Sequence, residues 1–432
     1  MTTSKRSSKV SINYDHLVGR LREALQSIPD HRGPNIVHQL ADVLMSAYAM
    51  FALKYPSLLS FEQQTKVEKE NLKQLFGIEK ICSDAQMRRI LDELSPSQID
   101  QLFAVFFRKM RRLSILNSYR FLNKYYLCSI DAVRYFESRK VNCEQCQHIK
   151  HQNGESSYHH AMLGAVLVHP DRRDVFPLMS EAMKRQKGQT KNDSELEASK
   201  RLHASILEHY GKLSLVIVED ALYANEPHLN HLLSLGYNFI VGVRPTKNVA
   251  LFRQLEGRQK RGDAKQLVIK RGQVIHYFYW TNNIPLNNRG NLRVNFLNYE
   301  QHYKGKVKKF SWVTSLTIRE GNVEQIMLGG RARWKIENET FNTLKNQGYH
   351  FEHNYGHGKK YLCDVLGKIM LLAFLIDQII QAANRHFNQI WVAAKAKKRV
   401  WEKIRAIYMT QAIQSFKELF IKMANIFEVK LE

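Results

Sequence analysis

The chain has 432 residues, and 65 Lys and Arg against 40 Asp and Glu give it a formal net charge of +25 with neutral histidines. Its hydrophobic content of 44% allows a chain of this length to bury a substantial core, which excludes intrinsic disorder, a collagen-like repeat and a small disulfide scaffold. A charge this high opposes compaction unless a polyanion is a working partner, so the composition favours nucleic acid as that partner.

Residues 1–124 are predicted to form a helical region, because apolar side chains recur there at spacings of three and four residues. Examples are Leu17, Leu21 and Leu25 and, further on, Leu40, Leu44 and Ala47. The helix that closes the region carries the basic residues Arg108, Lys109, Arg111 and Arg112. Such a cluster fits phosphate contacts, although a solvated helix face is its more common use.

From Tyr125 the pattern changes to short apolar runs that alternate with amphipathic segments, which predicts an α/β core over residues 125–385. The expected strands cover 125–131, 158–168, 213–218 and 237–243, and the expected helices cover 194–210 and 226–235. Between about residues 246 and 318 the helical period disappears, and turn residues separate four further apolar runs. We therefore expect a β-rich insertion within the core, then helices, and a basic helical C-terminal region over residues 386–432.

The cysteines and the apolar runs indicate a cytoplasmic protein without a membrane partner. Five cysteines are an odd number, and the chain begins with Met-Thr-Thr-Ser-Lys and no apolar signal segment, which fits a reducing compartment. The most apolar run, residues 369–376, is bracketed by Lys368 and Asp377. It is far shorter than the roughly 20 residues that cross a bilayer, so it predicts a buried helix.

One cysteine pair raises the possibility of zinc. Cys143 and Cys146 form a C-x-x-C pair, with His148, His151, His159 and His160 downstream. These residue types at this spacing can bind Zn²⁺. A single pair without a second one is a weak signal for zinc, and two reduced thiols in a loop after the first core strand are its more common explanation.

Two acids follow apolar runs of the predicted core. Asp131 comes directly after the run 127–130, and Asp220 follows the run 215–218 through Glu219. Each acid is therefore expected at the end of a core strand, where α/β folds place reactive groups. An acid in such a place can also simply cap a loop or a helix.

A third acid lies in the helical segment that begins at Arg331. On a wheel of about 100° per residue, Glu337 falls on the packed face with Phe341 and Leu344, and Glu339 falls on the polar face. A carboxylate on an apolar stripe is costly unless it is paired or metal-bound, and Arg333 is a possible structural partner. Three converging acids repel one another, a cost that Mg²⁺ or Mn²⁺ removes. Two such ions can activate water for phosphodiester cleavage.

These motifs resemble a known family. Ser-Ile-Asp131, Val-Glu-Asp220-Ala-Leu-Tyr-Ala-Asn and Arg333-Trp-Lys-Ile-Glu337, with a β-rich insertion between the second and third acids, are similar to bacterial insertion-sequence transposases of the DDE class. The resemblance covers about residues 125–385. It implies a ribonuclease-H-like mixed-sheet core that uses two metal ions, with Asp131, Asp220 and Glu337 as the catalytic, metal-binding triad. It also implies that Arg333 and Lys345 hold DNA phosphates.

The segment 349–361, just after the predicted catalytic helix, mixes aromatic, imidazole and basic groups. We expect His353 and His357 in it to contact DNA near the cut site. A polar loop that packs on the core explains the same composition equally well.

The resemblance implies a transposase that binds the ends of its insertion sequence, cleaves them with metal ions and joins them to target DNA. Residues 1–124 would bind the ends or form dimer contacts, in a homodimer assembled on double-stranded DNA within the bacterial nucleoid. The alternatives are a metal-dependent DNA nuclease without strand transfer, and a DNA-binding protein with an inactive core of this kind. The active-enzyme interpretation requires that the three carboxylates converge from neighbouring elements.

Overall fold

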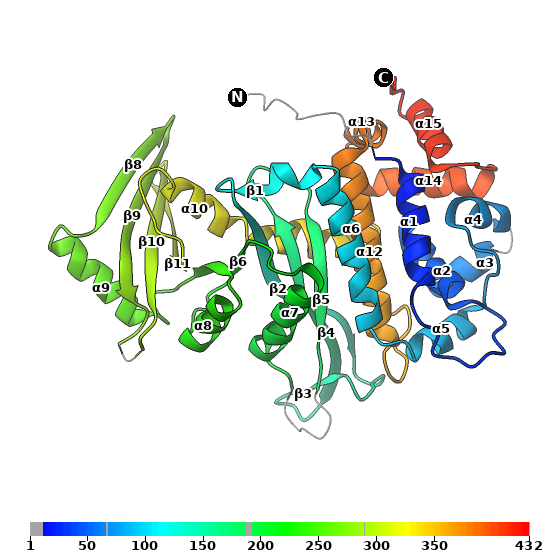
Figure 1. Cartoon of the computed structure of the whole chain (residues 1–432), viewed down its shortest axis with the longest axis horizontal. Coiled ribbons are helices and arrows are strands. Elements are labelled where there is room, and N and C mark those ends of the chain that lie inside the picture. Colours follow the sequence, from blue (N-terminus) through cyan, green and yellow to red (C-terminus); the bar gives the residue numbers. More distant parts are fainter. Residues whose placement is uncertain (1–11, 66–67, 186–191, 289, 432) are drawn as a thin grey trace.

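The computed structural model describes residues 12–65, 68–185, 192–288 and 290–431. Its elements form three parts along the longest axis: helices on the right, a mixed sheet in the centre and a β-rich part on the left (Figure 1). The predicted class, a mixed α/β chain with a β-rich insertion and with helices at both ends, is confirmed.

The N-terminal helices form one side of the molecule. They are α1 (Tyr14–Gln26), α2 (Leu40–Ala52), α3 (Leu58–Thr65), α4 (Lys69–Phe76), α5 (Asp84–Asp92), α6 (Ser97–Arg112) and the short 3₁₀ helix η1 (Ile115–Tyr119). Every residue of α2 is buried, because a helix that is apolar on all sides must lie inside a protein. Helix α1 is amphipathic and starts at Asn13, whose side chain accepts a hydrogen bond from the backbone N–H of Asp15.

The central sheet is built mainly by residues 120–242. Its strands are β1 (Arg120–Phe121), β2 (Tyr125–Ser138), β3 (Gln147–Lys150), β4 (Ser156–Val168), β5 (Phe176–Met183), β6 (Leu215–Glu219) and β7 (Asn238–Gly242). The helices of this region are α7 (Glu195–Tyr210), between β5 and β6, and α8 (Glu226–Ser234), between β6 and β7. Strand β2 pairs antiparallel with β4 and parallel with β6, and β6 pairs parallel with β7. This pairing places β2 and β6, the two strands expected to carry the acids, side by side.

The insertion continues the same sheet. It contains α9 (Val249–Lys260), β8 (Lys265–Arg271), β9 (Val274–Pro285), β10 (Arg293–Tyr303) and β11 (Lys306–Thr314). Strand β11 pairs antiparallel with β7, which joins the strands of the insertion and the core in the order β3-β4-β2-β6-β7-β11-β10-β9-β8. Helix α9 was not predicted, because it buries only Leu251 and Leu255 and so has little apolar periodicity.

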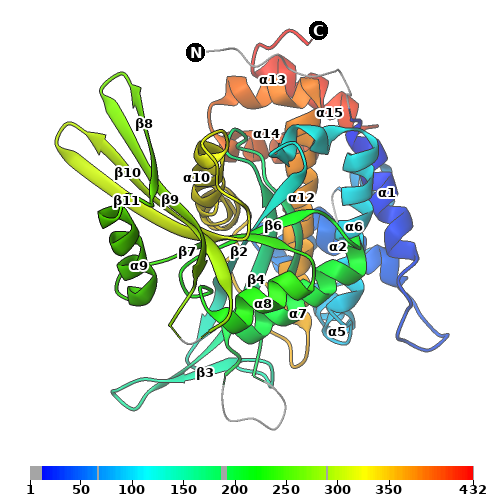
Figure 2. The same cartoon turned by 60° about the vertical axis from the view of Figure 1, so that its left-hand side comes forward.

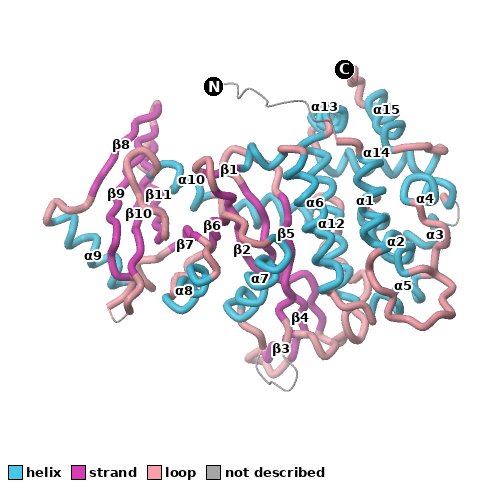
Figure 3. The backbone as a smooth tube through the Cα atoms, viewed as in Figure 1, coloured by secondary structure: helices cyan, strands magenta, loops and turns pink. Residues whose placement is uncertain are grey.

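The rest of the chain is helical. It contains α10 (Val323–Arg331), the π-helical segment η2 (Ile336–Phe341), α11 (Asn342–Asn346), α12 (Leu362–Ala383), α13 (Arg385–Ala394), α14 (Lys397–Thr410) and α15 (Phe416–Ile426). Helix α12 is buried from Leu362 to Ile380 and lies between the sheet and the N-terminal helices, as Figures 2 and 3 show from two directions. Within the described residues, no helix combines the length and hydropathy needed to cross a bilayer.

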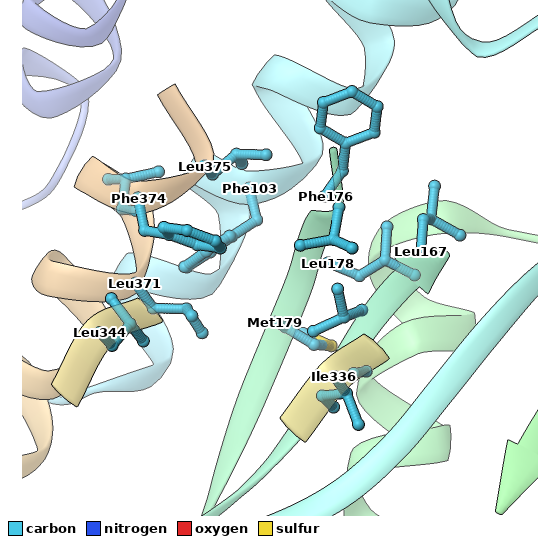
Figure 4. Close-up of a cluster of buried hydrophobic side chains, with 14 of the residues drawn as sticks. Phe103, Leu167, Phe176, Leu178, Met179, Ile336, Leu344, Leu371, Phe374 and Leu375 are labelled. Atoms are coloured by element: carbon cyan, nitrogen blue, oxygen red, sulfur yellow. The ribbon is translucent and has the colours of Figure 1, made fainter. Parts of the chain in front are cut away.

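A single hydrophobic cluster joins the sheet, α6 and α12 (Figure 4). Phe103 of α6 lies beside Phe374 of α12 there, and Met179 of β5 lies near Ile336. Ile336 and Leu344 belong to the same cluster, and both are fully buried. These two residues flank Glu337, so the backbone on either side of that acid is anchored in the core.

A buried ion pair connects the two helical regions. Lys54, just after α2, places its Nζ 2.7 Å from an oxygen of Asp377 on α12, and their side chains are only 3% and 4% exposed. The same oxygen accepts a hydrogen bond from the hydroxyl of Tyr349. The ammonium also lies over the ring of Trp401 on α14, 4.2 Å from its centre. One charged contact therefore ties together four segments that are distant in sequence.

We predict that Lys54→Met lowers the free energy of unfolding by about 3–5 kcal/mol, because Asp377 stays buried without its charge partner. Lys73→Met is the control, because Lys73 pairs with Glu79 on the exposed surface and this substitution should lower the free energy of unfolding far less than Lys54→Met. Denaturant unfolding of both variants measures the difference. An equal decrease in the free energy of unfolding for both variants would show that the buried Lys54–Asp377 pair does not stabilise the contact between the helical regions.

Candidate active site

Strands β2 and β6 place Asp131 and Asp220 side by side. Their parallel register pairs Tyr126 with Leu215 and Ser129 with Val218. The same register continued by two residues brings Asp131 level with Asp220. Both side chains are partly exposed, so the sheet holds two acids at one accessible position.

Asp131 does not end its strand, contrary to the prediction. Strand β2 continues to Ser138, paired antiparallel with β4, and Asp131 lies opposite Gly164 there. What ends just before Asp131 is the parallel ladder with β6, whose last pair is Ser129 and Val218. Asp220 does follow its strand, and its Oδ1 accepts a hydrogen bond from the backbone N–H of Leu222 at 2.7 Å. The acids therefore sit where β2 and β6 separate.

Arg333 connects the first acid to the third. Its Nη1 lies 2.7 Å from Oδ2 of Asp131, and its Nη2 lies 3.9 Å from Oε2 of Glu337. Ser129 of β2 donates a hydrogen bond to the backbone carbonyl of Arg333 at 2.9 Å. Burial raises the pKa of the Asp131 carboxyl, Arg333 opposes that effect, and the charge of Asp220 adds to it. Arg333 therefore contacts Asp131 and Glu337, and Asp220 lies beside Asp131 at the strand junction.

Glu337 is exposed, and its predicted place on a packed face is wrong. Its side chain is 57% exposed, whereas that of Glu339 is 28% exposed and lies 4.0 Å from Lys397 of α14. The reason is the π-helical segment η2. A π-helix closes its hydrogen bonds from residue i to i+5, so each residue turns through less than the α-helical 100° and the wheel misplaces the side chains. Glu337 keeps its contact with Arg333 and remains accessible from outside.

A glycine lets η2 approach the sheet. A Cβ atom on Gly164 of β4 would lie 3.1 Å from the ring of Phe341 and 3.6 Å from the side chain of Ile336. Because Gly164 is opposite Asp131, η2 packs against the sheet next to the strand residue that carries the first acid.

A fourth acid faces the site and was not found from the sequence. Glu195 lies in the first turn of α7 and accepts a hydrogen bond from the hydroxyl of Tyr223 at 3.3 Å. Burial raises the pKa of Glu195, and the charges of Asp131 and Asp220 raise it further. An acid in the first turn of a helix is common for reasons of helix stability alone, so its sequence position carried no functional signal.

The residues predicted to contact DNA are in different surroundings. Lys345 is partly exposed and pairs with Glu352 at 2.7 Å. His353 is exposed, and its ring packs edge-on against Tyr355. His357 is only 6% exposed. Its ring lies inside the protein, which favours a loop that packs on the core over a DNA contact for this residue.

Two histidines face the C-x-x-C pair, and only one of them is among the four that the sequence suggested. Of the four downstream histidines, His160 alone faces it, with Nε2 3.4 Å from Sγ of Cys143. His357 faces it from the other side, with Nε2 3.2 Å from Sγ of Cys146. The other three, His148, His151 and His159, contact the hydroxyls of Ser156 and Ser157 instead.

The acids around Arg333 offer only oxygen donors. Asp131, Asp220 and Glu337 supply carboxylates, with Glu195 close behind. Carboxylate oxygens that crowd one another are the donors that hard divalent cations prefer, and a cation removes their mutual repulsion. The side chains therefore fit Mg²⁺ or Mn²⁺ better than a metal that requires sulfur or imidazole ligands.

Comparison with known proteins identifies one matching family. The family model described as "Transposase DDE domain" matches residues 137–360, which is just over half of the chain. The match includes Asp220 and Glu337 and begins shortly after Asp131. A comparison with curated proteins finds no match.

We predict that Gly164→Val lowers the free energy of unfolding by about 1–3 kcal/mol, because the new side chain must displace Phe341 from a packed core. The control is Gly19→Ala on the surface of α1, where a Cβ meets no atom within 4 Å, and it should stabilise the helix by about 0.5–1 kcal/mol. Thermal and denaturant unfolding measure both. Unchanged stability of Gly164→Val would contradict the close packing of η2 on β4.

Proposed function

The chain belongs to the transposase DDE domain family, and on that premise we propose that it cleaves the DNA ends of its own insertion sequence and joins them to target DNA. The family has a ribonuclease-H-like fold, acts on DNA and uses divalent metal ions. The observation that carries the proposal for this chain is the Arg333 contact. It links Glu337 to Asp131, which the parallel register sets beside Asp220.

Asp131, Asp220 and Glu337 would hold two Mg²⁺ or Mn²⁺ ions, which when bound activate a nucleophile and stabilise the leaving oxygen. Arg333 orients the Asp131 carboxylate and offsets part of the negative charge of the site. Glu337 is exposed, so a DNA phosphate can approach it without movement of the core. The exposed face of this site is where the scissile phosphodiester would bind.

The reaction proceeds in two displacements at phosphorus. Water attacks the phosphodiester at the element end and releases a 3′ hydroxyl. That hydroxyl then attacks a phosphodiester of the target DNA, where a new P–O bond forms, the target's own P–O3′ bond breaks and the target's 3′ hydroxyl leaves. Neither step needs a covalent bond to the protein, which agrees with a site composed of acids and one arginine.

The basic surplus would hold the DNA. Exposed cations lie at the end of α6 and along the start of α14, among them Arg108, Arg111, Arg112, Lys398, Arg399 and Lys403. Lys397 and Arg405 are occupied inside the protein, by Glu339 and by the backbone carbonyl of Lys54. We assign end binding to the helical regions at both termini. Because two ends must be cut together, a homodimer would assemble on the DNA.

We predict that Asp131→Asn, Asp220→Asn and Glu337→Gln each abolish DNA cleavage, because metal ligation needs the ionised oxygens. DNA binding should remain, since phosphate contacts are made elsewhere. Glu339→Gln is the matched control and should keep most activity, because Glu339 faces Lys397. Cleavage and strand-joining assays with Mg²⁺ measure these effects. Cleavage without joining by the unmodified protein would indicate a nuclease, and no cleavage at all would indicate an inactive core.

We predict that the affinity for DNA falls steeply as the salt concentration rises, because the proposed binding relies on ionic contacts of Lys and Arg side chains with DNA phosphates. If six or more phosphates are neutralised, affinity should fall about 10³-fold or more between about 50 and 200 mM salt. A mobility-shift titration over a salt series measures the slope. Affinity that does not change with salt would contradict an electrostatic grip.

A further inference from the structure

We propose that Cys143, Cys146, His160 and His357 bind one structural zinc ion, at a site distinct from the acidic triad. One donor atom from each residue can be chosen so that all four lie within 4.8 Å of one another. Cys146, His160 and His357 are buried, and Cys143 is partly exposed. Two thiolates and two imidazoles form a donor set that is typical of structural zinc.

Three of the six distances between donor atoms are close to those of a tetrahedral ion. With Zn–S of about 2.3 Å and Zn–N of about 2.0–2.1 Å, a tetrahedron places its two sulfurs about 3.8 Å apart and sulfur about 3.6 Å from nitrogen. The two cysteine sulfurs are 3.9 Å apart. The sulfur-to-nitrogen distances are 3.4 Å for Cys143 and His160 and 3.2 Å for Cys146 and His357. Each distance lies within a few tenths of an ångström of the expected value.

Both histidines are oriented as metal ligands. The Nε2 atoms face the sulfurs, and the Nδ1 atoms face hydrogen-bond acceptors: Asp364 at 3.0 Å from His160, and the carbonyl of Gly358 at 3.5 Å from His357. An Nδ1–H that donates to an acceptor leaves the Nε2 lone pair free for a metal, which is the usual outer arrangement of zinc-bound histidine. Asp364 is itself fixed by a hydrogen bond from the hydroxyl of Tyr135 at 2.7 Å.

Asp92 holds the loop that carries His357 through hydrogen bonds to the loop's backbone. Its carboxylate accepts hydrogen bonds from the backbone N–H groups of four consecutive residues just after Gly358: Lys359, Lys360, Tyr361 and Leu362. Gly358 has a positive φ, and a Cβ there would lie only 2.2 Å from an oxygen of Asp92. These backbone contacts to Asp92 hold the loop in the position that brings His357 next to the cysteines.

A zinc ion at this site would connect three segments that are distant in sequence. Cys143 and Cys146 lie between β2 and β3, His160 lies on β4, and His357 lies between α11 and α12. The segment that follows the Glu337 helix is thereby fastened to the strands that carry and flank Asp131. A metal bound at this point stabilises the fold by constraining those segments relative to one another. Zinc binding at this site does not depend on the proposed transposase activity.

The test is the zinc content of the purified full-length chain, measured by elemental analysis. We expect one zinc per chain, and loss of zinc in Cys143→Ser/Cys146→Ser and in His357→Gln. The matched controls are Cys82→Ser and His151→Gln, which remove a thiol and an imidazole outside the cluster and should keep the ion. Asp131→Asn should also keep it, because the acids form a separate site. Zinc that is absent from the unmodified chain, or that survives loss of both cysteines, would overturn the proposal.

A second measurement needs no variant and so does not depend on whether the variants fold. Thiol alkylation of the unmodified protein, read residue by residue by mass spectrometry, should leave Cys143 and Cys146 unmodified until a chelator removes the metal. Replacement by Co²⁺ should give the visible absorption of a tetrahedral cobalt thiolate site. A disulfide between the two cysteines, or thiols that react equally with and without chelator, would contradict a metal site.

Discussion

The parallel pairing of β2 with β6 is the constraint on which the acidic site depends. Backbone hydrogen bonds set the register of the two strands, and that register brings Asp131 level with Asp220. A slip of one residue would turn every side chain of a strand to the opposite face, so the buried residues of β2 and β6 fix the acids as firmly as they fix the core. The cost is visible at Asp131, whose pKa is raised by burial and by the neighbouring acid.

The third acid is positioned by packing. Ile336 and Leu344 anchor the backbone on either side of Glu337 in the cluster with α6 and α12, and Phe341 rests on Gly164 of β4. Arg333 then completes the arrangement with contacts to both Asp131 and Glu337. A rigid core thus carries an exposed, highly charged edge, which is the combination that metal-dependent chemistry on a large polyanion requires. The proposed zinc site would strengthen the same connection from the far end of the segment.

The sequence was sufficient where the signal is local. The apolar runs before Asp131 and Asp220 predicted neighbouring core strands, and turn-rich residues predicted the β-rich insertion, both of which the fold confirms. The burial of Glu337 was wrong because a periodicity argument assumes an α-helix and cannot anticipate a π-helical turn. The surroundings of His357 could not be predicted either, because its partner Cys146 is 211 residues away in the chain. Glu195 carried no signal at all, since an acid in a first helical turn is ordinary.

The most direct test of the acidic site is anomalous diffraction from crystals of the protein bound to an element end in the presence of Mn²⁺. The account predicts two manganese peaks about 3.5–4 Å apart, ligated by Asp131, Asp220 and Glu337 and next to the scissile phosphate. Manganese bound elsewhere, or a phosphate held at this edge with no metal between it and the three carboxylates, would contradict it.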